Sequence, residues 1–439
     1  MGIRFPFTLS LIAFAFLLLS VFPTQGYAET KPPVKWTYKL SVNDPDVQEG
    51  EYIPVWKSIE QLNENIYITF TYKNPRTALQ VIGVDGKKKW DIIANTSGKY
   101  HFTSTPDTDG AVYVYTKEMS EFQKYDSKGS MAWSMPLTNG TFPSKAVIGS
   151  KGLVYIMHEI VPDVFELVAV DKKTGKTAWK YEPVSYRSFS AEEQLVIGPD
   201  GTIYMWITPN TLSAIRYDGK VKWTKNINAF ILSTPIFDKK GNLYLFTSKG
   251  ISALDKEGEK IWTYQPKDGH FFHMARGEDG TLFLKYENKI HAVKPDGKFK
   301  WEYTLKQDED KAERQFVGVP LAGKDGSLYV LAEGDRSTEP YYLYAIDKNG
   351  KEKWVSELQG DFSGFFVFPM DTKIQIDKDG ILYVPIRNKI FAVTPKGKEE
   401  WTLEYDRDDF AGPIIGADSS VYIGYENKLT AIKKGKKSK

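Results

Sequence analysis

Hydrophobic and polar residues alternate along this chain in short runs, and the alternation repeats. Residues 233–265, STPIFDKKGNLYLFTSKGISALDKEGEKIWTYQ, contain one complete copy of the pattern. Its four apolar runs are rich in aromatic and branched side chains, are bounded by Gly or Asp, and lack the spacing of an amphipathic helix. The pattern predicts an antiparallel meander of four strands, with Gly241 and Gly258 at positive φ in its two tight turns.

Two markers show how often this unit occurs. In the second strand an aromatic residue stands between two apolar residues, and this triplet occurs nine times, centred on Tyr67, Tyr113, Tyr155, Tyr204, Tyr244, Phe283, Tyr329, Tyr383 and Tyr422. In the fourth strand a tryptophan follows a turn glycine by four residues, and this pair occurs eight times, at Trp90, Trp133, Trp179, Trp223, Trp262, Trp301, Trp354 and Trp401. A single meander cannot bury both of its faces, so the copies are expected to pack on one another.

The last copy, residues 412–432, has three strands and no tryptophan. The missing fourth strand is found at the other end of the chain, where residues 34–38 read VKWTY and Trp36 occupies the tryptophan position without a preceding turn glycine. A strand exchanged between the two ends closes a ring and leaves only short, protected edges. We predict an all-β protein, a single eight- or nine-bladed β-propeller with nine units counted, whose N-terminal strand closes the last blade.

The first residues have the layout of a secretory signal peptide. Arg4 precedes an apolar run over residues 5–22, and the small residues Gly26 and Ala28 precede a cleavage site after Ala28. An uncleaved membrane anchor is the alternative, because the run is close to the length that spans a bilayer. The expected organisation is a signal peptide over residues 1–28, the propeller over 29–432, and a basic disordered tail over 433–439.

Composition narrows the possible chemistry. The chain has no cysteine, which excludes disulfides, thiolate metal sites, a cysteine nucleophile and a lipidated cysteine. The formal net charge of +2 falls to +1 without Arg4 and to −4 without the five tail lysines, so a nucleic-acid surface is not expected on the propeller. Residues 44–49 begin like a calcium loop, but Glu49 stands where the sharp turn needs glycine. We assign no catalytic, cofactor-binding or metal-binding residue.

Two kinds of connection alternate along the units. One kind is a stereotyped turn, such as Asp218-Gly219 or Asp296-Gly297, whereas the other is long and irregular, as over residues 332–341 and 356–369. In a four-stranded meander the two kinds lie on opposite faces of the ring, and binding usually occurs on irregular loops. The loop face is acidic with interspersed aromatics and arginines, which suits protein or carbohydrate recognition, although a solvated rim has the same composition. The candidate partner-binding residues are Tyr52, Trp56, Arg76, Arg187, Arg336, Asp361, Phe362, Phe365 and Phe366.

The units STPIFDKKGNLYLFTSKGISALDKEGEKIW and VPLAGKDGSLYV...LYAIDKNGKEKW resemble the repeats of PQQ-like (pyrroloquinoline-quinone-type) β-propellers. These tryptophan-docking repeats are shared by quinoprotein dehydrogenases and the outer-membrane-assembly propeller lipoprotein, and the resemblance covers essentially the whole mature chain. It implies that each tryptophan docks between neighbouring blades, and it says little about function, because the repeat residues are packing residues. The sequence departs from the family in three ways: it lacks the adjacent cysteines of the dehydrogenases, it lacks the lipidated cysteine, and it has nine units where eight are usual.

We therefore expect a secreted or cell-surface binding or scaffold protein that acts through its irregular loop face and is a monomer. The expected partner is a protein or a cell-wall polysaccharide and not nucleic acid, with membrane contact only through an uncleaved signal or the basic tail. Neither pyrroloquinoline quinone nor calcium is expected as a cofactor. The alternative is an enzyme on the same propeller, either a quinone-dependent dehydrogenase or a polysaccharide-active lyase or hydrolase.

Overall fold

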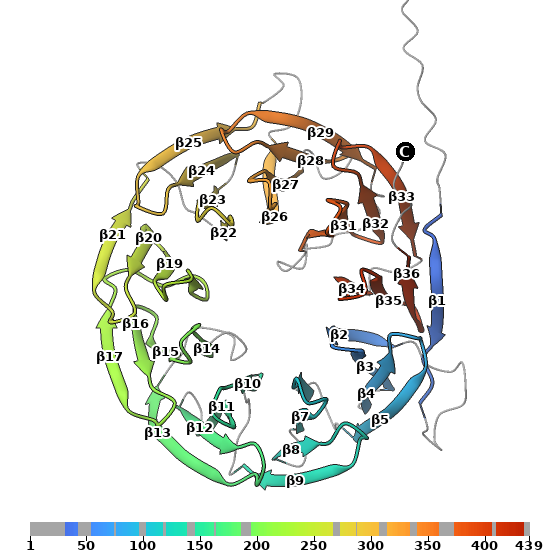
Figure 1. Ribbon diagram of the computed structural model, residues 1–439, viewed down its shortest axis with the longest axis vertical. Helices are drawn as coiled ribbons and strands as arrows, with labels where there is room; N and C mark the ends of the chain where they lie inside the picture. Colours follow the sequence, from blue (N-terminus) through green and yellow to red (C-terminus); the bar gives the residue numbers. More distant parts are fainter. Residues whose placement is uncertain are drawn as a thin grey trace, which may run out of the picture.

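In a computed structural model of the protein, nine four-stranded antiparallel sheets surround a common axis and form a closed ring (Figure 1). The sheets are the blades of a β-propeller, numbered 1 to 9 along the chain. The described residues are 31–42, 54–73, 76–95, 102–116, 120–137, 145–161, 164–185, 195–266, 273–286, 288–306, 314–333, 340–359, 373–405 and 410–433. No helix occurs among them, so none of these segments is a membrane-spanning helix. The predicted all-β propeller is confirmed, and its blades number nine.

The strands follow the chain in blade order. Blade 1 contains β2 (Val55–Leu62), β3 (Asn65–Lys73), β4 (Arg76–Gly83) and β5 (Lys88–Asn95). Blade 2 contains β6 (Phe102–Pro106), β7 (Val112–Thr116), β8 (Glu121–Tyr125) and β9 (Met131–Pro136). Blade 3 contains β10 (Val147–Ile148), β11 (Leu153–Val161), β12 (Val164–Asp171) and β13 (Thr177–Ser185). Blade 4 contains β14 (Leu195–Ile197), β15 (Ile203–Thr208), β16 (Thr211–Ile215) and β17 (Val221–Asn226). Blade 5 contains β18 (Ile236–Phe237), β19 (Leu243–Thr247), β20 (Gly250–Leu254) and β21 (Lys260–Tyr264). Blade 6 contains β22 (His273–Arg276), β23 (Leu282–Tyr286), β24 (Lys289–Val293) and β25 (Phe299–Thr304). Blade 7 contains β26 (Gln315–Ala322), β27 (Leu328–Glu333), β28 (Tyr341–Ile346) and β29 (Glu352–Leu358). Blade 8 contains β30 (Gln375–Ile376), β31 (Leu382–Ile386), β32 (Lys389–Val393) and β33 (Glu399–Glu404).

Blade 9 joins the two ends of the described chain. Its strands are β34 (Phe410–Ile415), β35 (Val421–Tyr425), β36 (Lys428–Ile432) and, as the outermost strand, β1 (Val34–Lys39). Strands β1 and β36 are antiparallel, and the pairing is continued by a hydrogen bond of 2.8 Å from the Leu40 amide to the Asn427 carbonyl. The Nζ atom of Lys35 also lies 2.8 Å from the Asp418 carboxylate in the first turn of the blade. The predicted closure by the N-terminal strand is confirmed.

The hydrophobic core lies in the seams, which are the packed contacts between neighbouring blades. In β19 the side chains of Leu243 and Leu245 pack toward blade 4, whereas those of Tyr244 and Phe246 pack toward blade 6. Because both faces of the strand are covered, every residue of β19 is buried, while residues of the outer strand β21 range from exposed to partly buried. The aromatic triplet in each second strand is therefore a signature of burial on both sides.

Eight of the nine fourth-strand tryptophans reach across a seam to the following blade. The indole Nε1 of Trp262 donates to the carbonyl oxygen of Pro295 at 3.0 Å, and its ring centroid lies 5.8 Å from that of Tyr244 in its own blade. The indole covers the turn of blade 6 at Gly297, where a Cβ atom would lie 2.6 Å from Trp262 Cδ2. The same contact joins eight pairs: Trp36 with Gly86, Trp90 with Gly129, Trp133 with Gly175, Trp179 with Gly219, Trp223 with Gly258, Trp262 with Gly297, Trp301 with Gly350, and Trp354 with Gly397.

The pairing in space differs from the pairing in sequence. Along the chain each turn glycine stands four residues before the tryptophan of its own blade, but in the ring it receives the tryptophan of the preceding blade. Trp401 is outside the set of eight pairs, although it is buried, because blade 9 has no turn between its third and fourth strands, β36 and β1. Blades 1 to 8 therefore each have a turn glycine that receives a tryptophan, and blade 9 does not.

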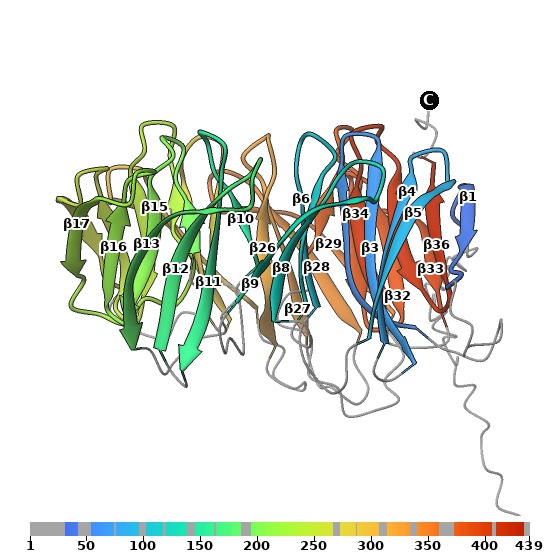
Figure 2. The same ribbon diagram turned by 90° about the horizontal axis from the view of Figure 1, so that it is seen from below.

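The two faces of the ring are visible from the side. Strands β11 and β13 run downward in Figure 2 and end at the lower edge, which is the loop face, whereas the turns within hairpins β10–β11 and β12–β13 lie at the upper edge. The upper edge is called the turn face below. Turn-face glycines such as Gly110, Gly219 and Gly297 have φ values of 83°, 84° and 83°, so the positive φ expected of these turns is confirmed.

Candidate functional site

Most of the predicted partner-binding residues lie outside the described residues, namely Tyr52, Arg187, Arg336, Asp361, Phe362, Phe365 and Phe366. Arg76, at the start of β4 on the loop face, is partly buried. Trp56 is only 6% exposed, and its indole Nε1 donates to the Glu426 carbonyl of blade 9 at 3.0 Å. The ring also packs against Phe70 at 6.1 Å between centroids, so Trp56 joins blade 1 to blade 9 and offers little surface to a partner.

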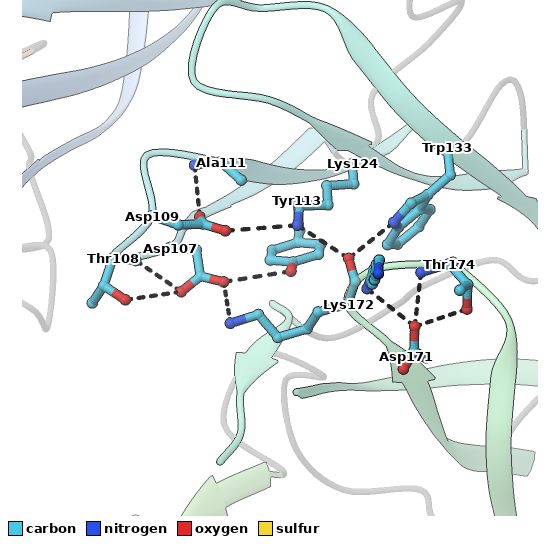
Figure 3. Close-up of polar contacts among 11 residues, drawn as sticks. Asp107, Thr108, Asp109, Ala111, Tyr113, Lys124, Trp133, Asp171, Lys172 and Thr174 are labelled. Carbon is cyan, nitrogen blue, oxygen red and sulfur yellow. Dashed lines mark hydrogen bonds and ion pairs between the residues drawn. The ribbon is translucent and has the colours of Figure 1, made fainter. Parts of the chain in front are cut away.

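A dense polar cluster lies on the turn face between blades 2 and 3 (Figure 3). The Asp107 carboxylate is buried beside the β6–β7 turn and forms an ion pair with Lys172 of blade 3. It also accepts the Thr108 amide at 2.7 Å and the Tyr113 hydroxyl at 3.4 Å. Burial alone would raise the pKa of Asp107, but the hydrogen bonds from Lys172 and Thr108 outweigh it and hold the pKa below its ordinary value.

The same lysine is held at its backbone. The carbonyl oxygen of Lys172 accepts the Lys124 ammonium at 3.0 Å and the Trp133 indole at 3.1 Å, both from blade 2. Lys172 is therefore clamped at its side chain and at its main chain by the neighbouring blade. Because the carboxylate and the ammonium are used in joining two blades, the chemistry of this cluster is structural.

The clamp predicts a pH-dependent stability. Because the folded pKa of Asp107 lies below the ordinary value of 3.8, the ionised carboxylate stabilises the fold above that pH, and the contribution is lost as the pH falls through and below it. We expect Lys172→Met to leave a buried, unpaired carboxylate and to lower the free energy of unfolding at neutral pH by about 3 kcal/mol. Thermal melting from neutral to strongly acidic pH measures both effects.

The matched control for that experiment is Lys128→Met, which changes an exposed turn-face lysine of blade 2. We expect its melting curve to follow that of the parent protein at every pH. The difference between the parent and Lys172→Met should shrink as Asp107 becomes protonated. A constant difference down to strongly acidic pH would contradict the assigned role of the Asp107 carboxylate.

Two further titratable groups are buried toward the loop face. Lys285 of β23 donates from Nζ to the Phe316 carbonyl of blade 7 at 2.9 Å, and burial lowers its pKa to about 8 although Glu333 opposes the shift. His158 of β11 lies 3.3 Å from the Glu166 carboxylate, and burial lowers its pKa as well. Sequence reasoning missed Lys285, and the available signal was a lysine in LFLK where the unit of blade 5 has phenylalanine in LYLF. Both groups are enclosed in seams, where they tie strands together.

Exposed apolar side chains gather on the loop face between blades 4 and 5. Phe230 is 59% exposed and Leu232 is 40% exposed, while Ile231 between them is buried. The Ile231 amide donates to the Pro209 carbonyl of blade 4 at 2.8 Å, and the Leu232 amide donates to the Phe246 carbonyl of blade 5 at 2.9 Å. Because successive side chains of an extended segment point in opposite directions, anchoring Ile231 turns its two neighbours outward.

Phe230 and Leu232 are called the apolar patch below. The Phe230 amide also donates to the Ser248 hydroxyl at 3.1 Å, so the segment is held to both blades. Sequence reasoning did not select these residues, because the connection is short and was not among the long irregular loops from which the candidates were drawn. The signal was the run of apolar residues in AFIL. In the described part of the chain, no group of three or more His, Asp or Glu side chains is close enough to hold a metal ion.

Comparison with known proteins places the chain among propellers. The sequence profile of the family described as outer membrane protein assembly factor BamB matches residues 163–332 and 247–433. The chain is similar in structure to BamB from Moraxella catarrhalis, with a TM-score of 0.48, 12% identity, and coverage of 91% of this chain and 97% of that one. It is also similar to the quinohemoprotein alcohol dehydrogenase ADHIIG from Pseudomonas putida HK5, with a TM-score of 0.49, 12% identity, and coverage of 92% and 76%. No curated protein matches the chain, and at these identities the structural likeness concerns the fold alone.

Proposed function

Since the chain belongs to the family described as outer membrane protein assembly factor BamB, a family of PQQ-like propellers, we propose that it is a non-enzymatic binding protein of the cell envelope. In this proposal the ring is a rigid scaffold, and the loop face holds a protein partner. The family description names an assembly factor, which agrees with a scaffold role. The fold supports such a role because every blade is packed between two neighbours, so the ring is a rigid support for the loops.

The observation that carries the proposal is the apolar patch. Interaction surfaces place aromatic and aliphatic side chains at their centre, and exposed apolar residues next to one another mark such surfaces. Phe230 and Leu232 belong to a segment whose backbone is hydrogen-bonded to blades 4 and 5, so little backbone freedom is lost on binding. The patch is offered in a fixed position, as a docking surface requires.

Capture of a partner tests the proposal. We expect the immobilised protein to retain a defined envelope protein after cross-linking, and Phe230→Ser combined with Leu232→Ser to reduce that capture by about tenfold, because buried aromatic anchors dominate interface energies. The matched control changes two exposed lysines in the turn between β18 and β19 on the opposite face, Lys239→Glu with Lys240→Glu. Equal capture by all three forms would contradict a partner site at the apolar patch.

A second experiment addresses the enzymatic alternative. We expect the purified protein, incubated with pyrroloquinoline quinone and calcium and then desalted, to retain no quinone absorbance. We also expect no dye-linked oxidation of alcohols or sugars, since the chain contains no adjacent cysteines to stack on the quinone. Stoichiometric retention of the quinone together with dye reduction would overturn the non-enzymatic proposal.

A further inference from the structure

A groove of about 420 Å³ lies at the outer rim of the ring, between blades 4 and 5. Residues of β17 and β21 line its walls, residues of β20 line its floor, and residues of the connection after β17 line the end next to the apolar patch. The volume is within the roughly 300–1,000 Å³ of typical ligand sites. This space is called the rim groove below.

The rim groove exists because the residues that fill other seams are replaced here. At four seams the residue two positions after the tryptophan is a tyrosine: Tyr38, Tyr181, Tyr264 and Tyr303. At the seam between blades 6 and 7, the Tyr303 hydroxyl donates to Glu352 at 2.8 Å and the Tyr303 ring centroid lies 6.3 Å from that of Tyr344. The Arg314 guanidinium covers the Tyr342 ring of the same seam at 4.0 Å.

Register identifies the residues at the same positions in the seam between blades 4 and 5. Ala345 pairs with Trp354 as Ala253 pairs with Trp262, and Phe316 pairs with Ala332 as Ile231 pairs with Thr247. Counting from these pairs places Lys225 at the position of Tyr303, Ser252 at that of Tyr344, Gly250 at that of Tyr342, and Ala229 at that of Arg314. Two large side chains that line the other seam are thus replaced by serine and alanine, and the tyrosine that would fill the space is a lysine. Gly250 adds no space, because a Cβ atom there would meet the backbone of Tyr264.

Hydroxyl groups on the floor and wall of the rim groove are available for hydrogen bonding. At the seam between blades 3 and 4, the Ser213 and Thr224 hydroxyls bond to each other at 2.9 Å. The matching residues Ser252 and Thr263 are also paired in register, but within the described chain neither hydroxyl has a hydrogen-bond partner. Ser252 is 8% exposed and, like Thr263, lines the groove, so its hydroxyl is within reach of a ligand there.

The charge of the rim groove is positive. Three lysines and one glutamate line it, and the glutamate, Glu259, is paired with Lys225 at 2.8 Å. Lys249 donates to the Asn228 carbonyl at 2.9 Å, and among the described residues no carboxylate lies within ion-pair distance of Lys249 or Lys260. Two lysine charges therefore favour an anionic group at the mouth.

We propose that the rim groove is the docking site for a partner polypeptide that carries a tyrosine beside an acidic residue. The tyrosine ring occupies the space that Tyr303 and Tyr344 fill at the seam between blades 6 and 7. Its hydroxyl bonds to Ser252 or Thr263, and the neighbouring carboxylate pairs with Lys249 or Lys260. This inference rests on the proposed function and deepens it, because it names the chemistry of the bound segment.

The lining favours a polypeptide over a sugar. Tyr264, the aromatic residue among those that line the groove, turns toward blade 6, where its hydroxyl lies 3.0 Å from His291 Nδ1. Its ring face is therefore not a platform on which a sugar can stack. The unfilled apolar space beside hydroxyls and ammonium groups instead matches the ring, the phenol and the carboxylate of an acidic tyrosine segment.

The test uses a fluorescent, end-blocked peptide of sequence Gly-Glu-Tyr-Glu-Gly and measures its anisotropy with the full-length protein. We expect saturable binding that weakens by at least about tenfold when the tyrosine is replaced by alanine or both glutamates by lysine. Binding should also weaken with added salt, because the ion pairs are exposed. Absence of binding, or equal binding of the alanine peptide, would overturn the proposal.

Two variants locate the bound peptide. Ser252→Tyr fills the groove from within, as Tyr344 does at the other seam, and is expected to abolish binding at an unchanged melting temperature. Lys249→Glu with Lys260→Glu reverses two surface charges, so it leaves the fold intact and decides the question if Ser252→Tyr does not fold. Lys239→Glu with Lys240→Glu is the matched control and should bind as the parent does. Binding that survives charge reversal, or a neutral cell-wall oligosaccharide that displaces the peptide, would refute the assignment.

The same variants separate this inference from the proposed function. If Phe230→Ser with Leu232→Ser abolishes partner capture while Ser252→Tyr does not, the loop face binds a partner and the rim groove is not its site. If neither variant affects capture, the proposed function also fails. The inference holds when Ser252→Tyr reduces both peptide binding and partner capture.

Discussion

Deletion of β1, residues 34–39, is expected to remove the cooperative unfolding transition of the ring. The strand supplies the whole outer edge of blade 9 and pairs along its length with β36. Its tryptophan, Trp36, donates to the Val84 carbonyl at 3.0 Å and covers Gly86, so the same strand docks blade 9 onto blade 1. Without it the last blade has an open edge and the seam between blades 9 and 1 loses its outer contact.

Single substitutions grade this effect. Trp36→Ala is expected to lower the free energy of unfolding by about 3 kcal/mol, the lower end for a core aromatic, because the ring is only partly buried. Val34→Ala in the same strand is the matched control, since Val34 is exposed and its loss should matter little. Chemical denaturation followed by tryptophan-independent circular dichroism measures both. An unchanged transition after deletion of the strand would show that the ring closes without it.

The architecture was predictable because every repeat carries the same signals for strands and turns. Short strands buried on both faces are indicated by the period-two alternation, the turn glycines and the aromatic triplet. Nine such copies must pack on one another, and a closed ring gives every copy two neighbours. The split blade followed from Trp36, which matches the repeat but lacks a turn glycine. These inferences need only local sequence and the count of units.

The candidate site was not predictable in the same way. The rim groove results from Ser252 and Ala229, which are ordinary residues until register shows that the seam between blades 6 and 7 carries Tyr344 and Arg314 at those positions. A single sequence does not show where small side chains leave a space unfilled, because that depends on which residues face one another in the fold. Trp56 illustrates the opposite difficulty, because an aromatic residue beside acidic loops reads as a binding residue whether it is exposed or, as here, buried against blade 9.

The docking contact between blades can be isolated by two glycine substitutions. Gly297→Ala places a methyl group 2.6 Å from Trp262 Cδ2 in a turn with φ +83°, whereas Gly152→Ala places one at φ +74° with no atom within 4 Å. Gly152→Ala therefore measures the backbone strain alone, about 1 kcal/mol. We expect Gly297→Ala to lower stability by roughly 3 kcal/mol, because overpacking against the indole adds to the strain.

A double-mutant cycle assigns the excess to the indole. In a Trp262→Ala background the ring is absent, so Gly297→Ala should cost no more than Gly152→Ala does, and the coupling between positions 262 and 297 should be about 2 kcal/mol. The tryptophan that stands four residues after Gly258 in its own blade would then be shown to act on the glycine of the next blade. If Gly297→Ala costs the same with and without the Trp262 indole, each glycine is there for its turn alone, and the tryptophans do not lock neighbouring blades together.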